Sequence, residues 1–159
     1  MKKNTSLVFL SLFLLFSCKK YPNGPTFSLR SPIQRIVGAW SLKSYLINGN
    51  DSTVVFNNYT LIPGIDLNDP GLSDTSSYLI RGGVDSAYYV TNIGWYEFKN
   101  KKTELVLIAT KVVNDLNMAG PLISSSVVTY KILRLTKKEL WLQTEYNERN
   151  YELHYERAE

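Results

Sequence analysis

The sequence predicts an all-β fold, an antiparallel up-and-down barrel of about eight strands. Short segments rich in Val, Ile, Thr and aromatic residues recur along the chain, which holds eleven Tyr, six Phe and three Trp. These residue types suit half-buried sheet surfaces, and clusters of Asn, Asp, Gly and Pro separate the segments as turns do. Helical periodicity is nearly absent. Without helical crossovers the strands must run antiparallel, and closing the sheet into a barrel is the simplest way to hide its edges.

The expected elements begin after residue 30. A short helical turn over 31–37 has Ser31 as its cap and Pro32 at its first position. In the first strand, 39–47, alternation places Trp40, Leu42 and Leu46 on one face. Further strands are expected over 52–56, 77–81, 87–91, 95–99, 103–111, 127–135, 140–146 and 151–157, with a hairpin turn at 100–102. Residues 57–74 and 114–125, which contain Pro and Gly, are expected to form two long loops.

The N-terminus has the features of a secretion signal. Lys2 and Lys3 precede an apolar run over 7–16, which is too short to span a bilayer because a spanning helix needs about 20 residues. Leu15-Phe16-Ser17-Cys18 resembles the lipobox of bacterial lipoproteins, so residues 1–17 are expected to be a lipoprotein signal peptide and Cys18 the acylated first residue of the mature chain. The alternative is a soluble secreted protein with one chance cysteine.

Acylation of Cys18 predicts a membrane anchor. The acyl groups, such as palmitate, hold firmly when two or more are present. Cys18 is the only cysteine, so no thiol remains for a disulfide, a zinc site or a nucleophile. No acidic run follows Cys18, which favours the periplasmic face of the outer membrane, and a location on the cell surface stays open.

The rest of the chain reads as a tether and one domain. Residues 18–32 contain three prolines and few apolar side chains, as expected of an extended lipidated tether. Residues 33–159 then form the barrel domain, which is long enough for a core of its own. Once residues 1–17 are removed, 16 basic and 14 acidic residues remain. This near balance, with the basic residues scattered, argues against a nucleic-acid partner.

Two segments carry a resemblance to a known family. Gly38-Ala39-Trp40, at the start of the first strand after a helical turn, resembles the Gly-x-Trp start of lipocalins, and residues 135–142 resemble the penultimate hairpin of bacterial lipocalin-like lipoproteins. The resemblance implies that Trp40 lies at the closed end of the barrel with an arginine across its ring. Arg157 is the first candidate for that arginine and Arg149 the second.

The resemblance has limits that the sequence itself shows. Residues 128–130, Val-Thr-Tyr, lack the aspartate of the family's middle motif, and no room remains for the family's C-terminal helix. A lipocalin-like barrel is therefore expected rather than a classical lipocalin.

The chain offers little for catalysis or metal binding. His154 is the only histidine, and Glu152 and Glu156 share its strand face. Same-face neighbours on a strand lie nearly 7 Å apart at about 3.3 Å per residue, too far to chelate one ion together, so a solvated charged face is expected. No nucleophile motif accompanies His154. We therefore expect no catalytic residue, no metal and no cofactor.

Two functions of different class remain. The first is a carrier that binds or sequesters a small hydrophobic ligand in the cell envelope, as the lipocalin resemblance implies. Its cavity would open opposite Trp40, and the candidate lining residues are Tyr45, Tyr88, Trp95 and Tyr96. The second is a non-catalytic interaction module or inhibitor with a filled barrel, which contacts an envelope protein through apolar residues of its two long loops, Leu61, Ile62, Ile65, Leu67, Leu122 and Ile123.

Overall fold

The computed structural model describes residues 20–25, 28–56, 60–63, 77–82, 89–112, 121 and 127–158. Cys18 and Tyr88 lie outside these residues, as do Ile65, Leu67, Leu122 and Ile123 of the expected loops. The predictions that concern them are therefore not addressed by the structure. Among the described residues, no helix is long and apolar enough to cross a membrane.

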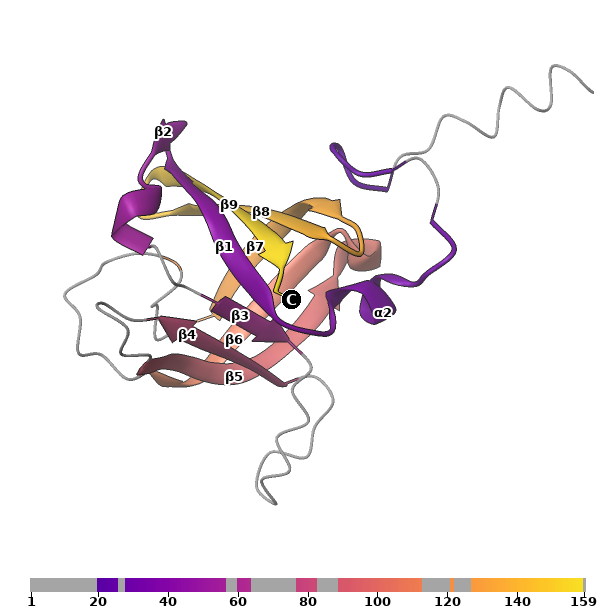
Figure 1. Cartoon of the computed structure of the whole chain (residues 1–159), viewed down its shortest axis with the longest axis horizontal. Helices are drawn as coiled ribbons and strands as arrows, with labels where there is room; N and C mark the ends of the chain where they lie inside the picture. Colours follow the sequence, from indigo (N-terminus) through magenta and orange to yellow (C-terminus); the bar gives the residue numbers. More distant parts are fainter. Residues whose placement is uncertain are drawn as a thin grey trace, which may run out of the picture.

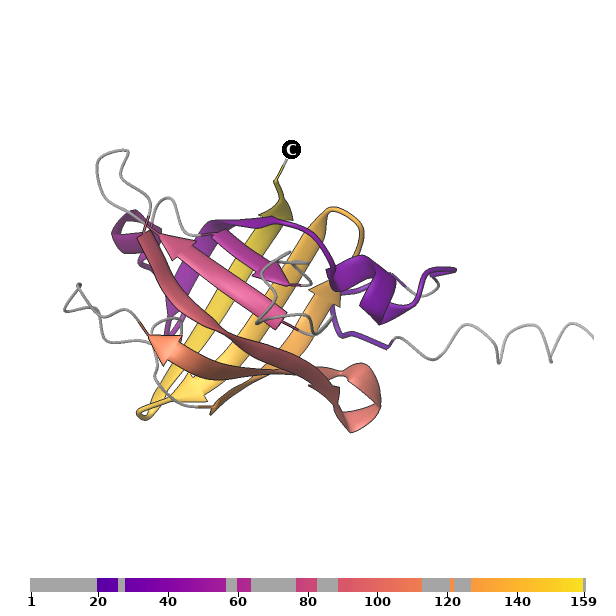
Figure 2. The ribbon, with the colours of Figure 1, turned by 90° about the horizontal axis from the view of Figure 1, so that it is seen from below.

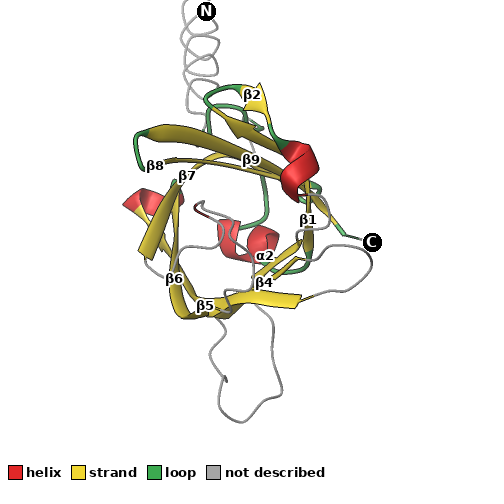
Figure 3. Cartoon of the chain, turned by 90° about the vertical axis from the view of Figure 1, so that its left-hand side faces the viewer, coloured by secondary structure: helices red, strands yellow, loops and turns green. Residues whose placement is uncertain are grey.

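The described residues form one antiparallel sheet of nine strands that closes on itself (Figures 1 and 2). Strand β1 pairs with β3 on one side and with β9 on the other, and the strands between them follow chain order around the ring (Figure 3). The prediction of an all-β, up-and-down antiparallel barrel is confirmed. The strands are β1 (Trp40–Ile47), β2 (Asn50–Asp51), β3 (Thr60–Pro63), β4 (Ser77–Gly82), β5 (Tyr89–Lys99), β6 (Glu104–Val112), β7 (Val127–Leu135), β8 (Glu139–Tyr146) and β9 (Arg149–Arg157).

The barrel has two distinct ends, which follow from the strand register. We call the end that holds Trp40 the closed end. It carries helix α2 (Pro32–Ile36), the β5–β6 turn with the 3-10 helix η2 (Asn100–Lys102), and the β7–β8 turn. The opposite, mouth end carries the β1–β2 turn and the β8–β9 turn. The strand ends that flank 64–76 lie at the closed end, and those that flank 113–126 lie at the mouth end.

The first strand departs from simple alternation. A register shift lies between Leu42 and Ser44 in the β1–β9 ladder. Because of the extra residue, Trp40, Leu42 and Tyr45 all lie in the core, whereas Leu46 is half-buried on the other face. The expectation that Leu46 shares the face of Trp40 and Leu42 is therefore wrong.

The segment after β1 also differs from the expectation. Residues expected as a strand over 52–56 form the 3-10 helix η1 (Thr53–Phe56). The Asp51 carboxylate accepts hydrogen bonds from the Thr53 amide, at 2.8 Å, and from the Thr53 hydroxyl, and such a local bond turns the backbone away from a ladder. Strand β3 then falls inside the stretch 57–74 that was expected to be a loop.

Strand β5 replaces two expected strands. The sequence reads as strands over 87–91 and 95–99, separated by Asn92-Ile93-Gly94, but the structure has a single strand of eleven residues. Gly94 does not make a turn: a Cβ at this position would clash with the Ile108 carbonyl oxygen on β6. Glycine at this position allows the backbones of β5 and β6 to approach each other closely.

The N-terminal part of the described chain lies against the barrel. Helix α2 begins at the predicted cap, Ser31, which forms a capping box with Gln34: the side chain of each bonds to the backbone amide of the other. Upstream, Tyr21 is 1% exposed and belongs to the core cluster. Residues 20–25 are thus part of the folded domain, although the sequence suggested an extended tether.

Candidate functional site

The closed end is built around Trp40. Its ring is completely buried, and its Nε1 donates to the Ile36 carbonyl at 2.7 Å, which fixes the end of α2 against the barrel. The Arg157 guanidinium lies over the ring, with its carbon 4.2 Å from the ring centroid. This is the arrangement that the lipocalin resemblance implies for the pair. A cation stacked on an indole face is stabilising by about 0.5–2 kcal/mol.

Arg157 also holds the chain ends together. Its side chain donates to the carbonyls of Lys137 (2.8 Å), Val37 (2.6 Å) and Arg35 (2.7 Å). Gly38 lies beneath it with φ +124°, and a Cβ there would clash with the guanidinium. Burial lowers the pKa of Arg157. Since the contacts of this group tie separate segments of the chain together, we assign Gly38, Trp40 and Arg157 a structural role.

In the part of the barrel that the structure describes, side chains of the protein itself fill the interior along β1 and β6 to β9. Core residues contributed by five strands are 0% exposed, so that not even a water molecule can touch them. They leave no room for a ligand among them. These residues are Trp40, Tyr45, Leu105, Tyr130, Ile132, Leu135, Leu140 and Leu153.

The described core residues in the half of the barrel nearest the mouth end are buried as well. The Tyr130 hydroxyl donates to the Pro121 carbonyl at 3.0 Å, and both residues are buried. The chain between β6 and β7 therefore reaches back over the core at this point. Asn92 is 3% exposed, and Tyr151 packs at 5.9 Å from Tyr45.

The structure places three of the four aromatic residues proposed to line a cavity. Tyr45 lies in the core beside Tyr151, and Tyr96 lies in the core at 6.3 Å from Phe98, where burial raises the pKa of the Tyr96 hydroxyl. Trp95 is half-buried and faces the other side of β5 from Tyr96, because successive strand residues alternate. Tyr88 lies outside the described residues.

His154 belongs to a stack on the outer face of the sheet. Its ring lies 4.3 Å from that of Trp141 at an interplanar angle of 12°, and its Nε2 is 2.6 Å from a Glu152 oxygen. Arg134 lies over the same Trp141 ring, 5.1 Å from its centroid, and forms an ion pair with Glu139. In the part of the chain that the structure describes, no group of three His, Cys, Asp or Glu side chains is placed to hold a metal.

A hollow on the described surface lies outside the barrel. It is a shallow groove of about 710 Å³ between Lys20 and Pro22 of the N-terminal segment, the η2 turn, and the outer faces of β7 and β8. Most of the residues that line it have polar side chains, among them Glu104, Lys131 and Gln143. Sequence reasoning missed this groove because it exists only when residues 20–25 lie against the barrel.

The chain was compared with known proteins. No family model and no curated protein matches it. Among solved structures it is similar to a lipocalin-like protein from Bacteroides uniformis ATCC 8492, with 19% sequence identity and a TM-score of 0.56, over 78% of this chain and 99% of that chain. A likeness at this identity shows the fold alone. The fold is therefore a lipocalin-like antiparallel barrel, and its function must be argued from its own residues.

Proposed function

We propose that this protein is a non-catalytic binding module of the cell envelope, anchored by lipid on Cys18, in which the lipocalin-like barrel is a packed scaffold. The observation that carries the proposal is the interior in which core residues from β1, β6, β7, β8 and β9 are fully buried. A carrier needs space for its cargo, whereas a barrel of about eight strands is narrow enough for side chains to fill. The binding surface of such a module lies on its exterior, and the partner is an envelope protein.

The second candidate function is binding of a small hydrophobic ligand in the mouth half. It is favoured by the lipocalin-like fold and by aromatic side chains that gather there: Tyr151 packs against both Tyr45 and Tyr146, with ring centroids 5.9 and 6.4 Å apart. Saturable uptake of one fluorescent fatty acid per chain would support this candidate. The packed scaffold predicts no saturable uptake.

The anchor is tested by replacing Cys18 with serine. We expect the unmodified protein to stay with the outer-membrane fraction in high salt, because acyl chains hold by burial of methylene groups and not by charge. The Cys18→Ser chain should lose this salt-resistant attachment, and a Ser17→Ala chain, altered at a neighbouring small residue, should keep it. Salt-resistant membrane association of the Cys18→Ser chain would disprove lipid anchoring.

A further inference from the structure

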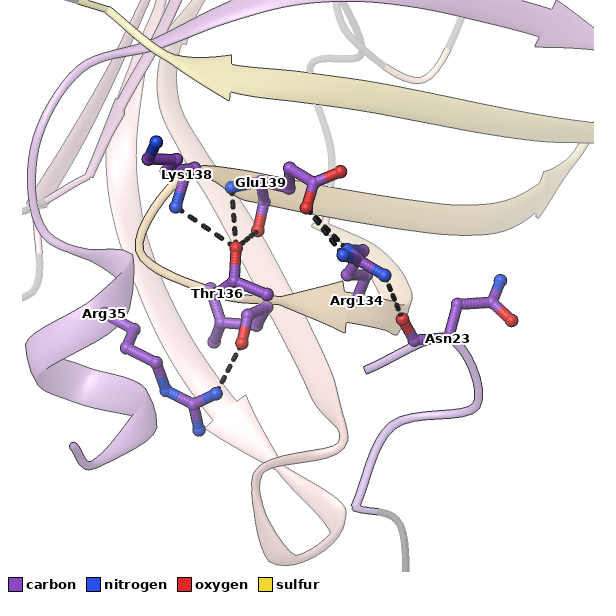
Figure 4. Close-up of polar contacts among 7 residues, drawn as sticks. Asn23, Arg35, Arg134, Thr136, Lys138 and Glu139 are labelled. Carbon is purple, nitrogen blue, oxygen red and sulfur yellow. Dashed lines mark hydrogen bonds and ion pairs between the residues drawn. The ribbon is translucent and has the colours of Figure 1, made fainter. Parts of the chain in front are cut away.

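The segment that follows the proposed lipid site is fixed to the closed end of the barrel. The Tyr21 hydroxyl donates to the Lys102 carbonyl at 3.0 Å, and the Asn23 amide donates to the Leu133 carbonyl at 2.8 Å. Arg134 donates in turn to the Asn23 carbonyl at 2.7 Å (Figure 4). These contacts hold residues 20–25 beside the η2 turn, and the guanidinium carbon of Arg35 on α2 lies 5.6 Å from the Tyr21 ring centroid.

This attachment limits how far the barrel can move from the bilayer. Two residues span at most about 7 Å, so an acylated Cys18 would keep Lys20 within that distance of the lipid surface. The distance is no greater than the range over which salt screens charges, roughly 8 Å at physiological ionic strength. The closed end must therefore lie next to the headgroups.

The closed end carries cations that have no acidic partner. We call six side chains the basic rim: Lys20, Arg30, Lys101, Lys102, Lys137 and Lys138. Five of them are exposed and Lys102 is half-buried, and among the described residues none lies within ion-pair distance of a carboxylate. Desolvation lowers the pKa of Lys20, and the charges of Lys102 and Arg35 lower it further, as expected where cations gather.

Apolar side chains are exposed at the same end. Leu29 is 90% exposed, and Ile33 and Val37, which lie on one face of α2 and its C-cap, are 49% and 42% exposed. Leu29 and Arg30 line a common hollow with Lys137. Exposed apolar side chains beside lysines and arginines are typical of surfaces that lie in the headgroup region of a membrane.

The mouth end lacks this combination. Its described turns carry Asp51, Glu145 and Glu148 against one cation, Arg149. Among the described residues, the closed end therefore carries most of the exposed basic and apolar side chains, although Glu104, Glu139 and Glu156 also lie there.

We propose that the basic rim, together with Leu29, Ile33 and Val37, is a docking surface for the phosphate headgroups of an anionic phospholipid leaflet, so that the barrel stands with its closed end on the membrane and its mouth end facing away. The proposal rests on the proposed lipid anchor at Cys18 for the short distance to the bilayer. The rim attracts the headgroups by charge, the apolar side chains enter the interface, and the mouth end is left free for a protein partner.

The test is lysine labelling of the protein purified from its own membranes and reconstituted into vesicles. A water-soluble acylating reagent modifies exposed amines, and mass spectrometry reports the rate at each lysine. In vesicles of phosphatidylglycerol and phosphatidylcholine we expect Lys20, Lys101 and Lys137 to react at least about threefold more slowly than in phosphatidylcholine alone. Lys43, exposed on the outer face of β1, should react equally in both. Equal rates at the rim in both vesicles would overturn the proposal.

Matched pairs of variants test whether the protection depends on this local surface or only on the net charge of the protein. Lys101→Gln with Lys102→Gln should abolish the protection of Lys137, whereas Lys43→Gln with Arg149→Gln removes the same charge elsewhere and should leave it intact. Similarly, Leu29→Ser with Ile33→Ser should weaken protection, and Val54→Ser, at a side chain 85% exposed on η1, should not. Loss of protection in both members of a pair would contradict a local docking surface.

The same samples test the basic rim and the lipid anchor at Cys18 separately. The mass of the N-terminal fragment shows whether Cys18 is acylated. An unmodified Cys18 with rim protection on anionic vesicles would refute the anchor and support the rim. Acylated protein whose rim is protected only in native envelopes, and not on anionic vesicles, would mean that a protein covers the rim and would overturn the lipid proposal.

Discussion

Arg157 shows why one residue can hold a barrel end together. Its planar guanidinium donates to three carbonyls on two segments while one face covers Trp40. Lysine has one nitrogen and no flat face, so it cannot reproduce both sets of contacts. Gly38 is part of the same arrangement, because any Cβ would occupy the space of the guanidinium.

Replacing Arg157 by lysine should therefore destabilise the fold. We expect the free energy of unfolding to fall by about 1–3 kcal/mol, through the lost hydrogen bonds to three carbonyls and the lost stacking on Trp40. The measurement is urea unfolding followed by tryptophan fluorescence. Arg149→Lys, at an exposed position on the same strand, is the control and should change stability by no more than about 0.5 kcal/mol. An equally small effect at Arg157 would contradict the role assigned to it.

Because the Tyr155 hydroxyl is buried, we expect the protein to lose stability at alkaline pH. Burial raises the pKa of its hydroxyl far above the ordinary value of about 10, and nearby Tyr45 raises it further. The folded state keeps this proton, while the unfolded chain releases it. The contribution of Tyr155 to the free energy of unfolding is therefore intact below about pH 10 and falls as the pH rises above that value. The Tyr155→Phe chain should thus lose less stability between pH 9 and about pH 11 than the unmodified chain in parallel urea titrations. Identical pH profiles would rule out this contribution.

At the scale of elements, strands with clean alternation were predictable and irregular ones were not. The last three strands, β7 to β9, lie within one or two residues of their predicted bounds, since each alternates and is followed or preceded by a short polar turn. The helical turn α2 was predictable from its cap and its proline. Local signals were sufficient in these cases.

The errors arose where a local signal had a nonlocal cause. Gly94 looks like a turn residue, but its role is to admit the Ile108 carbonyl from a neighbouring strand. The register shift near Lys43 has no signal in the sequence, because Leu46 and Tyr45 are both acceptable core residues until β9 fixes which one points inward. The position of Tyr21 could not be predicted either, because its hydroxyl bonds to the Lys102 carbonyl, 81 residues away, and the nearby Asn23 amide bonds to the Leu133 carbonyl on the distant strand β7.

The docked N-terminal segment makes a prediction at this scale. Tyr21→Ala should lower the free energy of unfolding by about 3–5 kcal/mol, as truncation of a fully buried aromatic residue does. Leu29→Ala, at a side chain 90% exposed, should have almost no effect. The measurement is again urea unfolding. If both substitutions were harmless, residues 20–25 would be a free tether and the short distance to the membrane would be lost.

At the scale of the whole molecule, the described residues combine a core packed along β1 and β6 to β9 with two chemically different ends. The sequence and its lipocalin resemblance predicted the barrel, and implied Trp40 and Arg157 as partners. Whether the interior is filled could not be predicted, because it depends on how side chains from several strands fit together, such as Tyr45 against Tyr151 and Tyr130 beneath Pro121. The basic rim likewise appears only when three separate segments meet at the closed end.

The central claim, that the barrel is a scaffold and not a carrier, is tested most directly by native mass spectrometry of the protein isolated gently from its own envelope. The packed interior predicts a mass equal to that of the polypeptide plus its covalent acyl groups, and organic extraction should release no stoichiometric molecule. A second, noncovalent mass of one small apolar molecule per chain, released by extraction, would contradict the claim and establish the barrel as a ligand carrier.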